Sequence, residues 1–387
     1  MTSPGTIYLD NNATTQCDPR VVERMLPYFT EVYGNPSNGY HSQGRMAARA
    51  IDDARGQIAD LIGAQPDEIF FTSGATESDN LAIFGLIERN DLTFPGRIVT
   101  SAIEHKAVLL PCNKLAERHH DVVFVPVTPE GVINISDAID AITPGTILVS
   151  IQLANNEIGT IQPIREIAEH AHAVGALFHT DAAQAVGKMP VDVNELGVDL
   201  LSVSAHKLYG PKGVGALFVR GGIRRIPLAP LFYGGGQERG VRSGTSNVPS
   251  IVGFGEAARI SAESLATEYG EIERLRDKFE SALAFRIPGI VINGQASTRL
   301  PNTSNLTFPD VDADAILLNL EDVMLGTGSA CNSGAMEPSH VLQAMGVSRE
   351  AAQRTIRASL GRFNSESQID IAIDSIVQCY ERAVELS

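Results

Sequence analysis

Cysteine is scarce in this chain, and its spacing excludes two classes of site. Only four cysteines occur among 387 residues, and none stands in a Cys-x-x-Cys pair or at a Cys/His spacing typical of zinc ligands. We therefore expect reduced thiols, no disulfide framework and no bound metal. A mass of 41.3 kDa favours two domains, on a prior of about 150 residues per domain. The four cysteines are Cys17, Cys112, Cys331 and Cys379.

Basic residues and long apolar runs are also few. Lys and Arg number 30 against 46 Asp and Glu, so the formal charge is −16, and such an acidic surface repels phosphate backbones and anionic membranes. No apolar run approaches the roughly 18 residues that a membrane helix needs. Residues 1–6 contain neither the basic stretch nor the apolar core of a secretory signal. We expect a cytoplasmic protein that binds neither nucleic acid nor membrane.

The sequence does contain enough apolar residues, 43%, for a substantial core. From about residue 45 to about residue 260, short runs rich in Val, Ile and Phe alternate with segments of helical period, a pattern typical of a parallel sheet covered by helices. We predict strands at Ile69–Thr72, Arg97–Ser101, Val122–Val127, Thr146–Leu153, Leu177–Asp181, Leu200–Ser204 and Gly213–Val219. We predict helices at Gln43–Leu61, Thr76–Ile87, His105–Arg118 and Pro163–Val174.

The pattern changes towards the end of the chain and indicates a second, smaller α+β domain. We expect a large domain over residues 16–258 and a small domain formed by residues 1–15 and 259–387. The glycine-bearing stretch Pro227–Gly240 is predicted to be a loop. In the small domain we predict a long helix at Ser261–Phe285, strands near Ile290–Ile292 and Thr303–Phe308, and helices at Ala313–Leu320 and Glu366–Glu385.

A phosphate-binding turn is indicated at residues 69–78, where a strand leads through Gly74 into a helix. Small residues there expose backbone N–H groups at the positive end of the helix dipole, so an anion could bind at Gly74, Ala75 and Thr76. The alternative is helix capping alone, since Thr76-x-x-Asp79 fits a capping box. The chain has no Walker A sequence and no G-x-G-x-x-G loop after its first strand, so those nucleotide sites are unsupported.

An acid and a lysine follow two other strands of the same predicted sheet. Asp181 ends an apolar run at the edge where open α/β sheets bind ligands, and its carboxylate could hold a proton on a heterocyclic nitrogen; helix capping is the alternative. Lys207 follows a strand, where partial desolvation lowers the pKa of its amine and favours a Schiff base; a solvated surface lysine is the alternative. Together with the anion-binding turn, these residues are the parts needed to bind pyridoxal 5′-phosphate.

Cys331 stands apart from the other cysteines because small residues surround it. The segment Gly326–Gly334 contains glycine and serine on both sides of the thiol, which predicts an exposed, mobile loop. A thiolate on such a loop could reach a substrate, whereas the alternative is an incidental exposed thiol. Cys17, Cys112 and Cys379 are expected to pack or to have no chemical role.

These residues resemble those of the pyridoxal-phosphate cysteine desulfurases, a group in the class V aminotransferase superfamily, of the type with the reactive cysteine on a long loop. The resemblance covers nearly the whole chain, from Ile7–Thr15 to Ile356–Phe363. It implies the α/β fold type I of pyridoxal-phosphate transferases, with a mainly parallel seven-stranded sheet in the large domain and the Cys331 loop on the smaller α+β domain. Around the cysteine, Thr327 and Asn332 depart from the family's usual residues.

The resemblance also implies roles for individual residues. Lys207 would bind the cofactor's aldehyde as a Schiff base, Asp181 would pair with its pyridine nitrogen, and Gln184 with its phenolic oxygen. His105 would stack on the ring and exchange a proton near the substrate thiol. Asn156 would lie beside the cofactor and, with Arg357, hold the substrate carboxylate, a role suited to arginine geometry. The phosphate would contact five groups of the same chain, Gly74, Ala75, Thr76, Ser204 and His206. It would also contact Thr245 of the partner subunit.

The implied reaction converts L-cysteine to L-alanine and leaves the sulfur on Cys331 as a persulfide. An acceptor protein of iron–sulfur cluster assembly or of another thiolation pathway would receive the sulfur, and the contact through Thr245 implies a homodimer with composite active sites. Because the chain ends at Ser387, without the tail by which iron–sulfur members contact their scaffold, we expect a specialised or more distant member. The alternative is an aminotransferase or C–S β-lyase that has no use for Cys331.

Overall fold

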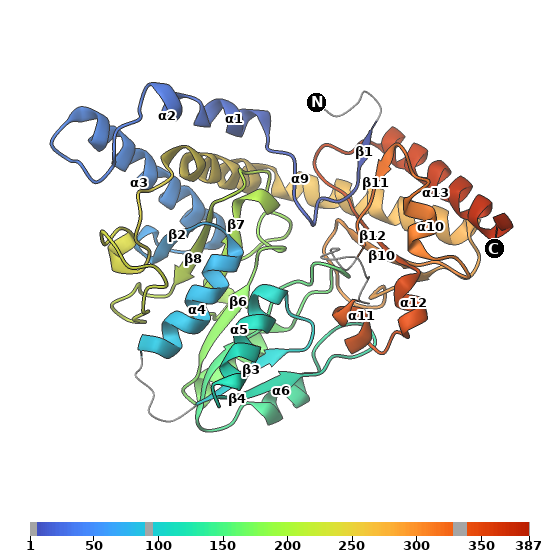
Figure 1. The fold of residues 1–387 in the computed structure, drawn as a ribbon, viewed down its shortest axis with the longest axis horizontal. Helices are drawn as coiled ribbons and strands as arrows, with labels where there is room; N and C mark the ends of the chain where they lie inside the picture. The colour runs from blue at the N-terminus through green and yellow to red at the C-terminus, as the bar shows by residue number, and fades with distance from the viewer. Residues whose placement is uncertain (1–5, 90–95, 328–338, 387) are drawn as a thin grey trace.

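The computed structural model describes residues 6–89, 96–327 and 339–386 (Figure 1). Its largest sheet has seven strands, of which β8 runs opposite to the other six. The predicted seven-stranded, mainly parallel sheet is therefore confirmed. In spatial order the strands are β2 (Ile69–Thr72), β8 (Gly215–Val219), β7 (Leu200–Ser204), β6 (Leu177–Asp181), β5 (Thr146–Ser150), β3 (Arg97–Ser101) and β4 (Asp121–Val125).

Both faces of this sheet are buried, because successive residues of each strand point into different cores. Phe70 and Leu200 pack in the core of one face, whereas their neighbours Phe71 and Leu201 pack in the core of the other. This is why the strands are continuous apolar runs and not alternating ones. One face is covered by α4 (Ala75–Arg89) and α5 (Lys106–Glu117), and the other by α3 (Ser42–Ile62), α6 (Ile135–Ala141), α7 (Ile164–Ala173) and part of α9 (Val248–Arg286).

Helix α9 is much longer than the predicted helix at Ser261–Phe285, because it begins at Val248. The side chain of Asn247 caps it by accepting a hydrogen bond from the Ser250 N–H at 3.3 Å. Its first half contributes Phe254 to the core of the large sheet, and its second half contributes Phe279 to a separate core. The predicted domain boundary at residue 258 falls inside this continuous helix (Figure 1). The division into two domains stays a prediction.

The second core lies around a three-stranded antiparallel sheet in the order β12-β10-β9. The N-terminal segment joins it: β1 pairs with β11, and Ile7 and Leu9 pack in this core. The sequence did not predict β12, and the predicted helix at Ala313–Leu320 ends earlier, at Leu317. The elements here are β1 (Ile7–Tyr8), β9 (Val291–Ile292), β10 (Thr303–Thr307), β11 (Val323–Met324), β12 (Thr355–Ser359), α10 (Ala313–Leu317), α11 (His340–Ala344), α12 (Arg349–Gln353) and α13 (Glu366–Leu386).

The remaining differences from the predictions are at element ends and in short helices. Three strands are shorter than predicted, with β4 ending at Val125, β5 at Ser150 and β8 beginning at Gly215. Pro227–Gly240 is a loop apart from a 3₁₀ turn at Glu238–Gly240. Six short helices were not predicted: α1 (Pro19–Met25), α2 (Pro27–Thr30), α6, α8 (Val193–Leu196), α11 and α12. The two-residue strands β1 and β11 were not predicted either. None of the helices described combines the length and apolar content needed to cross a membrane.

Candidate active site

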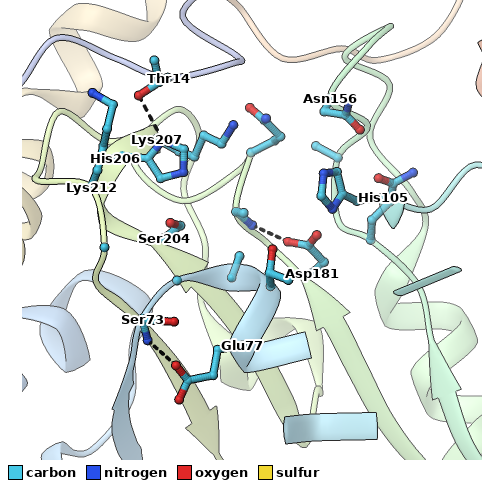
Figure 2. A pocket seen from close by; sticks show the side chains of 18 residues that line it. Thr14, Ser73, Glu77, His105, Asn156, Asp181, Ser204, His206, Lys207 and Lys212 are labelled. Carbon is cyan, nitrogen blue, oxygen red and sulfur yellow. Dashed lines mark hydrogen bonds between the residues drawn. The ribbon is translucent and has the colours of Figure 1, made fainter. Parts of the chain in front are cut away.

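A cavity of about 440 Å³ lies at the carboxyl edge of the seven-stranded sheet (Figure 2). Asp181 is the last residue of β6, Ser204 is the last residue of β7, and Gln152 follows β5 by two positions. This is the edge at which open α/β sheets bind ligands. The lining residues are Thr14, Ser73, Gly74, Ala75, Thr76, Glu77, His105, Gln152, Ala154, Asn156, Asp181, Ala183, Gln184, Ser204, His206, Lys207, Lys212 and Gly213.

The predicted anion-binding turn forms one end of the cavity. Gly74 has a φ of +152° between β2 and α4, and a side chain at this position would approach the Ser204 hydroxyl to 3.7 Å. The first N–H groups of a helix have no acceptors within it, so the start of α4 presents donors to an anion. The capping-box alternative is wrong, because α4 already begins at Ala75, and Asp79 is fully buried with neither carboxylate oxygen hydrogen-bonded.

Lys207 reaches the cavity from a 3₁₀ turn that directly follows β7. Its Nζ donates hydrogen bonds to the carbonyl oxygens of Asn12 at 2.5 Å and Ala13 at 2.8 Å. Burial, together with the positive charge of Arg357, lowers the pKa of this amine from 10.5 to about 8. A solvated surface lysine is therefore excluded. A lysine of this pKa is neutral in a useful fraction of molecules near neutral pH, as nucleophilic attack requires.

Asp181 lies in the cavity beside the anion-binding turn (Figure 2). One of its carboxylate oxygens accepts a hydrogen bond from the Ala183 N–H at 2.9 Å. Burial raises the pKa of this carboxyl, whereas positive charge on His105 and on Lys207 lowers it. A positively charged ring nitrogen bound beside Asp181 would likewise favour its ionised form.

His105 is the N-cap of α5, and its ring lines the cavity. Its Nδ1 accepts a hydrogen bond from the Ala107 N–H at 3.1 Å, so the neutral ring carries its proton on Nε2. Burial is the main cause that lowers the pKa of His105 below 6.5, and a neutral ring can both accept and donate a proton. The adjacent Glu104 is fully buried, and burial raises its pKa to about 8.

His206 and Gln184 complete the predicted cofactor-binding group in the cavity. The Nδ1 atom of His206 lies 3.1 Å from the Thr14 hydroxyl oxygen. A dashed line in Figure 2 marks this contact. Burial lowers the pKa of this histidine to about 4. The Nε2 atom of Gln184 donates a hydrogen bond to the carbonyl oxygen of Asn12 at 2.9 Å. Both side chains are therefore held by the segment that follows β1.

Arg357 lies on β12 and approaches the cavity from the smaller sheet. Its guanidinium donates hydrogen bonds to the carbonyl oxygen of Asn156 at 3.2 Å and to the carboxylate of Asp10 at 2.6 Å. Its Nε is buried without a hydrogen-bond partner in the described structure. Asn156 lines the cavity, whereas Arg357 is not among the residues that line it. The binding of a substrate carboxylate by this pair stays a prediction.

Two further predicted site residues remain. Thr245 is exposed and, like Arg357, does not line the cavity, and Cys331 lies outside the described residues. The other cysteines are free thiols in poor positions for chemistry, because burial raises the pKa of Cys112 to about 12 and also raises those of Cys17 and Cys379. Among the residues described, no cluster of three or more His, Cys, Asp or Glu could hold a metal ion.

Several residues of the site were missed by reasoning from the sequence. Asn12 and Thr14 belong to a segment that resembles the family, but that segment is nearly 200 positions from the lysine it contacts. Lys188 follows Gln184 by four positions and contacts its amide. No local pattern marks these contacts, because they form only when the N-terminal segment crosses the edge of the sheet. Gln152, Lys212 and Gly213 also line the cavity.

The residues present fit pyridoxal 5′-phosphate, which requires an anion site, an acid for its ring nitrogen and an amine for its aldehyde. Gly74 and the start of α4 provide a cradle that a larger side chain would narrow. Asp181 provides the acid, and Lys207 provides a buried amine of lowered pKa. All of these groups line one cavity.

Comparison with known proteins agrees with this geometry. Residues 7–371 match the family Aminotransferase class-V. Cysteine desulfurase IscS of Rickettsia bellii is 46% identical over 385 residues, which cover 98% of this chain and 92% of that protein. The mitosomal cysteine desulfurase of Encephalitozoon cuniculi is 45% identical, over 98% of this chain and 88% of that protein. A solved structure of a NifS-like protein has a TM-score of 0.90 and 39% identity, over 97% of this chain and 99% of that one.

The chain belongs to the cysteine desulfurases of the aminotransferase class-V family, which depend on pyridoxal 5′-phosphate. The predicted family, cofactor and fold type I are confirmed. The roles assigned to single residues and the homodimer stay predictions.

Proposed function

We propose that the protein removes sulfur from L-cysteine, releases L-alanine and holds the sulfur as a persulfide on Cys331. In atoms, L-cysteine and the Cys331 thiol yield L-alanine and the Cys331 persulfide. The observation that carries this proposal is the shared cavity of Lys207, Asp181 and the start of α4, in a chain 46% identical to a cysteine desulfurase. The other residues of the site would bind the cofactor and the substrate, transfer protons and accept the sulfur.

The cofactor would be held at four points by this chain's own residues. Gly74, Ala75, Thr76, Ser204 and His206 would contact its phosphate, Asp181 its ring nitrogen, and Gln184 its phenolic oxygen. Lys207 would be bonded to its aldehyde until substrate arrives. When bound, pyridoxal 5′-phosphate supplies the electron-accepting ring that stabilises negative charge at the substrate Cα.

Proton transfer would be divided between Lys207 and His105. Because its pKa is lowered to about 8, the released amine of Lys207 can remove the Cα proton of the substrate. His105 carries its proton on Nε2 when neutral, and this atom would exchange a proton with the substrate thiol. Asp181 would remain ionised beside the ring nitrogen and keep that nitrogen protonated.

Substrate orientation and sulfur transfer would require two further groups. Arg357 and Asn156 would bind the carboxylate of L-cysteine, and the unpartnered Nε of Arg357 supports this role. The Cys331 thiolate would attack the substrate sulfur, so that an S–S bond forms while the substrate Cβ–S bond breaks. Protonation of the remaining carbon skeleton then completes L-alanine.

We further propose a homodimer, in which Thr245 of the partner subunit would contact the cofactor phosphate. The exposure of Thr245 and its absence from this chain's own cavity support a role in a second subunit. The persulfide sulfur would pass to an acceptor protein of iron–sulfur cluster assembly or of another thiolation pathway. The three free thiols described fit a cytoplasmic, reducing environment.

The decisive experiment follows L-alanine release from L-cysteine together with persulfide labelling. It compares the native protein with Cys331→Ala, after the visible spectrum has shown the bound cofactor. Cys17→Ala is the matched control, because Cys17 is half-buried and does not line the cavity. We expect both products to be lost in Cys331→Ala and retained in the control.

Equal product formation by Cys331→Ala would instead identify an aminotransferase or a C–S β-lyase. Persulfide labelling of this variant then separates two cases. Label on another cysteine would show a persulfide at a different position, and no label would show that the protein forms no persulfide. For the dimer, Thr245→Ala should weaken cofactor binding, and sedimentation should give twice the mass of one chain. A monomer that binds cofactor with native affinity would contradict the composite site.

A further inference from the structure

Lys188 is a buried lysine to which the proposed reaction gives no role. It lies in the turn that follows β6, and only 8% of the residue is exposed. Within the described chain it forms no ion pair with a carboxylate, because both acceptors of its Nζ are neutral amide oxygens. Burying an amine is costly unless its donors are satisfied, so these two contacts account for its position.

The first acceptor defines the orientation of Gln184. The amine of Lys188 donates to Oε1 of Gln184 at 2.6 Å. Because lysine has donors and no acceptor, the amide oxygen must face Lys188 and the amide nitrogen must face away from it. One N–H of that nitrogen donates to the Asn12 carbonyl at 2.9 Å. The second remains for the cavity, which Gln184 lines.

The second acceptor of Lys188 is Asn12, which also contacts Lys207. Lys188 also donates to Oδ1 of Asn12 at 3.0 Å, and this oxygen accepts a further hydrogen bond from Asn302 at 3.0 Å. The backbone carbonyl of Asn12 in turn accepts hydrogen bonds from Lys207 and Gln184. Lys188 therefore helps to fix Asn12, which accepts hydrogen bonds from Lys207 and Gln184. Lys188 is not itself a lining residue of the cavity.

The hydrogen bonds of Lys188 match the donors of a neutral amine, and its pKa is lowered in the direction of that form. Burial lowers its pKa well below 10.5, and the positive charges of Lys207 and Arg357 lower it further. A neutral amine has two N–H groups, and Lys188 donates two hydrogen bonds. It can therefore orient amide groups without placing a second fixed charge beside Lys207.

We propose that Lys188 is a positioning residue that turns the amide N–H of Gln184 towards the phenolic oxygen of the bound cofactor. The inference rests on the proposed function, because it needs the cofactor in this cavity. Without Lys188 the amide can rotate, and the phenolic oxygen loses a donor. The negative charge on that oxygen is then less stabilised, so the proton that it shares with the neighbouring nitrogen of the bound cofactor is held more strongly. The pKa of the bound cofactor therefore rises.

The test measures the visible spectrum of the holoenzyme as a function of pH for Lys188→Met. We expect the midpoint of the cofactor's absorption change to rise by roughly 0.5 to 1 pH unit, the size expected for one lost hydrogen bond. In Gln184→Leu the midpoint should rise similarly, and the double variant should show no additional shift. Lys114→Met, at an exposed lysine, is the control and should keep the native midpoint.

Thermal unfolding of the same variants separates positioning from a purely structural role. A structural role would lower the unfolding temperature of Lys188→Met while its spectral midpoint stayed native, and this result would overturn the inference. Full additivity of the two shifts would also overturn it, because Lys188 would then act independently of Gln184. If Lys188→Met does not fold, Lys188→Gln replaces it, with the same expected rise because its shorter side chain cannot reach Gln184 in the same way.

The two proposals fail in different ways. A native protein with no visible cofactor band would contradict the proposed function and remove the basis of this inference with it. A native band that does not respond to Lys188→Met, in a folded variant, would contradict only the inference.

Discussion

Arg357 and Asp10 form an ion pair of 2.6 Å that joins β12 to the segment following β1. The pair uses one nitrogen of the guanidinium, and a second donates to the Asn156 carbonyl. The buried Nε has no partner in the described structure. Asp10 therefore fixes one nitrogen of the Arg357 guanidinium, while the Nε donor stays without an acceptor among the described residues.

The first prediction concerns this donor. Arg357→Lys should raise the KM for L-cysteine by roughly 10- to 100-fold with a smaller effect on kcat, because lysine offers a point charge in place of a planar fork. Steady-state kinetics of alanine release will measure it. Arg286→Lys, in an exposed pair with Asp374, is the control. An unchanged KM would show that another group binds the substrate carboxylate.

The second prediction uses the lowered pKa of Lys207. In the cofactor-free protein, the unfolded chain keeps the lysine proton up to about pH 10.5, whereas the folded chain releases it near pH 8. Between these values the unfolded state binds more protons, so this group makes the free energy of unfolding increase with pH. The gain over that window is roughly 3 kcal/mol.

Lys207→Met should lack this gain. Urea unfolding at about pH 7.5 and about pH 10 will measure the difference between native and variant proteins, which should shift in favour of the native protein as pH rises. Parallel pH curves would mean that Lys207 titrates at its ordinary value.

The third prediction concerns Glu104, whose pKa burial raises to about 8. Its carboxylate accepts hydrogen bonds from the Ser101 hydroxyl at 2.5 Å and from the Gln152 N–H at 3.0 Å. Between about pH 4.5 and about pH 8 the folded state binds more protons than the unfolded state, so this group makes stability fall as pH rises.

Glu104→Gln removes that titration, so its unfolding temperature should fall less than that of the native protein between pH 5 and pH 8. Calorimetry at about pH 5 and about pH 8 is the measurement. Glu169→Gln, in an exposed pair with Arg165, should retain the native pH dependence. The same slope in Glu104→Gln would show that Glu104 is ionised throughout this range.

The fourth prediction concerns a buried ion pair that attaches the loop after β8 to β2. Arg55 donates to both carboxylate oxygens of Glu238 at 2.9 Å, and one of these oxygens also accepts the Phe71 N–H at 3.0 Å. Glu238→Gln removes the bidentate partner of the buried guanidinium and leaves the exposed Asp52 carboxylate 3.9 Å from its Nε, so the free energy of unfolding should fall by about 3 to 5 kcal/mol.

Chemical denaturation will test this value against Glu169→Gln, which should change stability by less than about 0.5 kcal/mol because its pair is exposed. A loss of similar size in both variants would contradict a special role for the buried pair.

Local pattern was sufficient for the strands of the large sheet. Ile69–Thr72, Arg97–Ser101, Leu177–Asp181 and Leu200–Ser204 have the predicted bounds, because runs of β-branched and aromatic residues are buried on both faces. The sequence predicted the ends of an element less well where those ends depend on contacts with other segments. The helical period, for example, did not locate the start of α9 at Val248. The strand β12 was missed because its polar residues Thr355 and Arg357 are buried by contacts with distant segments.

The sequence by itself determined the alternation of strands and helices, and it placed the acid, the lysine and the anion-binding turn at strand ends. Those strand ends meet at one edge because parallel strands share their direction. Only the tertiary structure decided which neutral oxygens and counter-ions surround them. The hydrogen bonds of Asn12 to Lys207 and Lys188, and of Arg357 to Asp10, join residues far apart in the chain. Such contacts have no local signal, and the burial they create sets the pKa of the reactive amine.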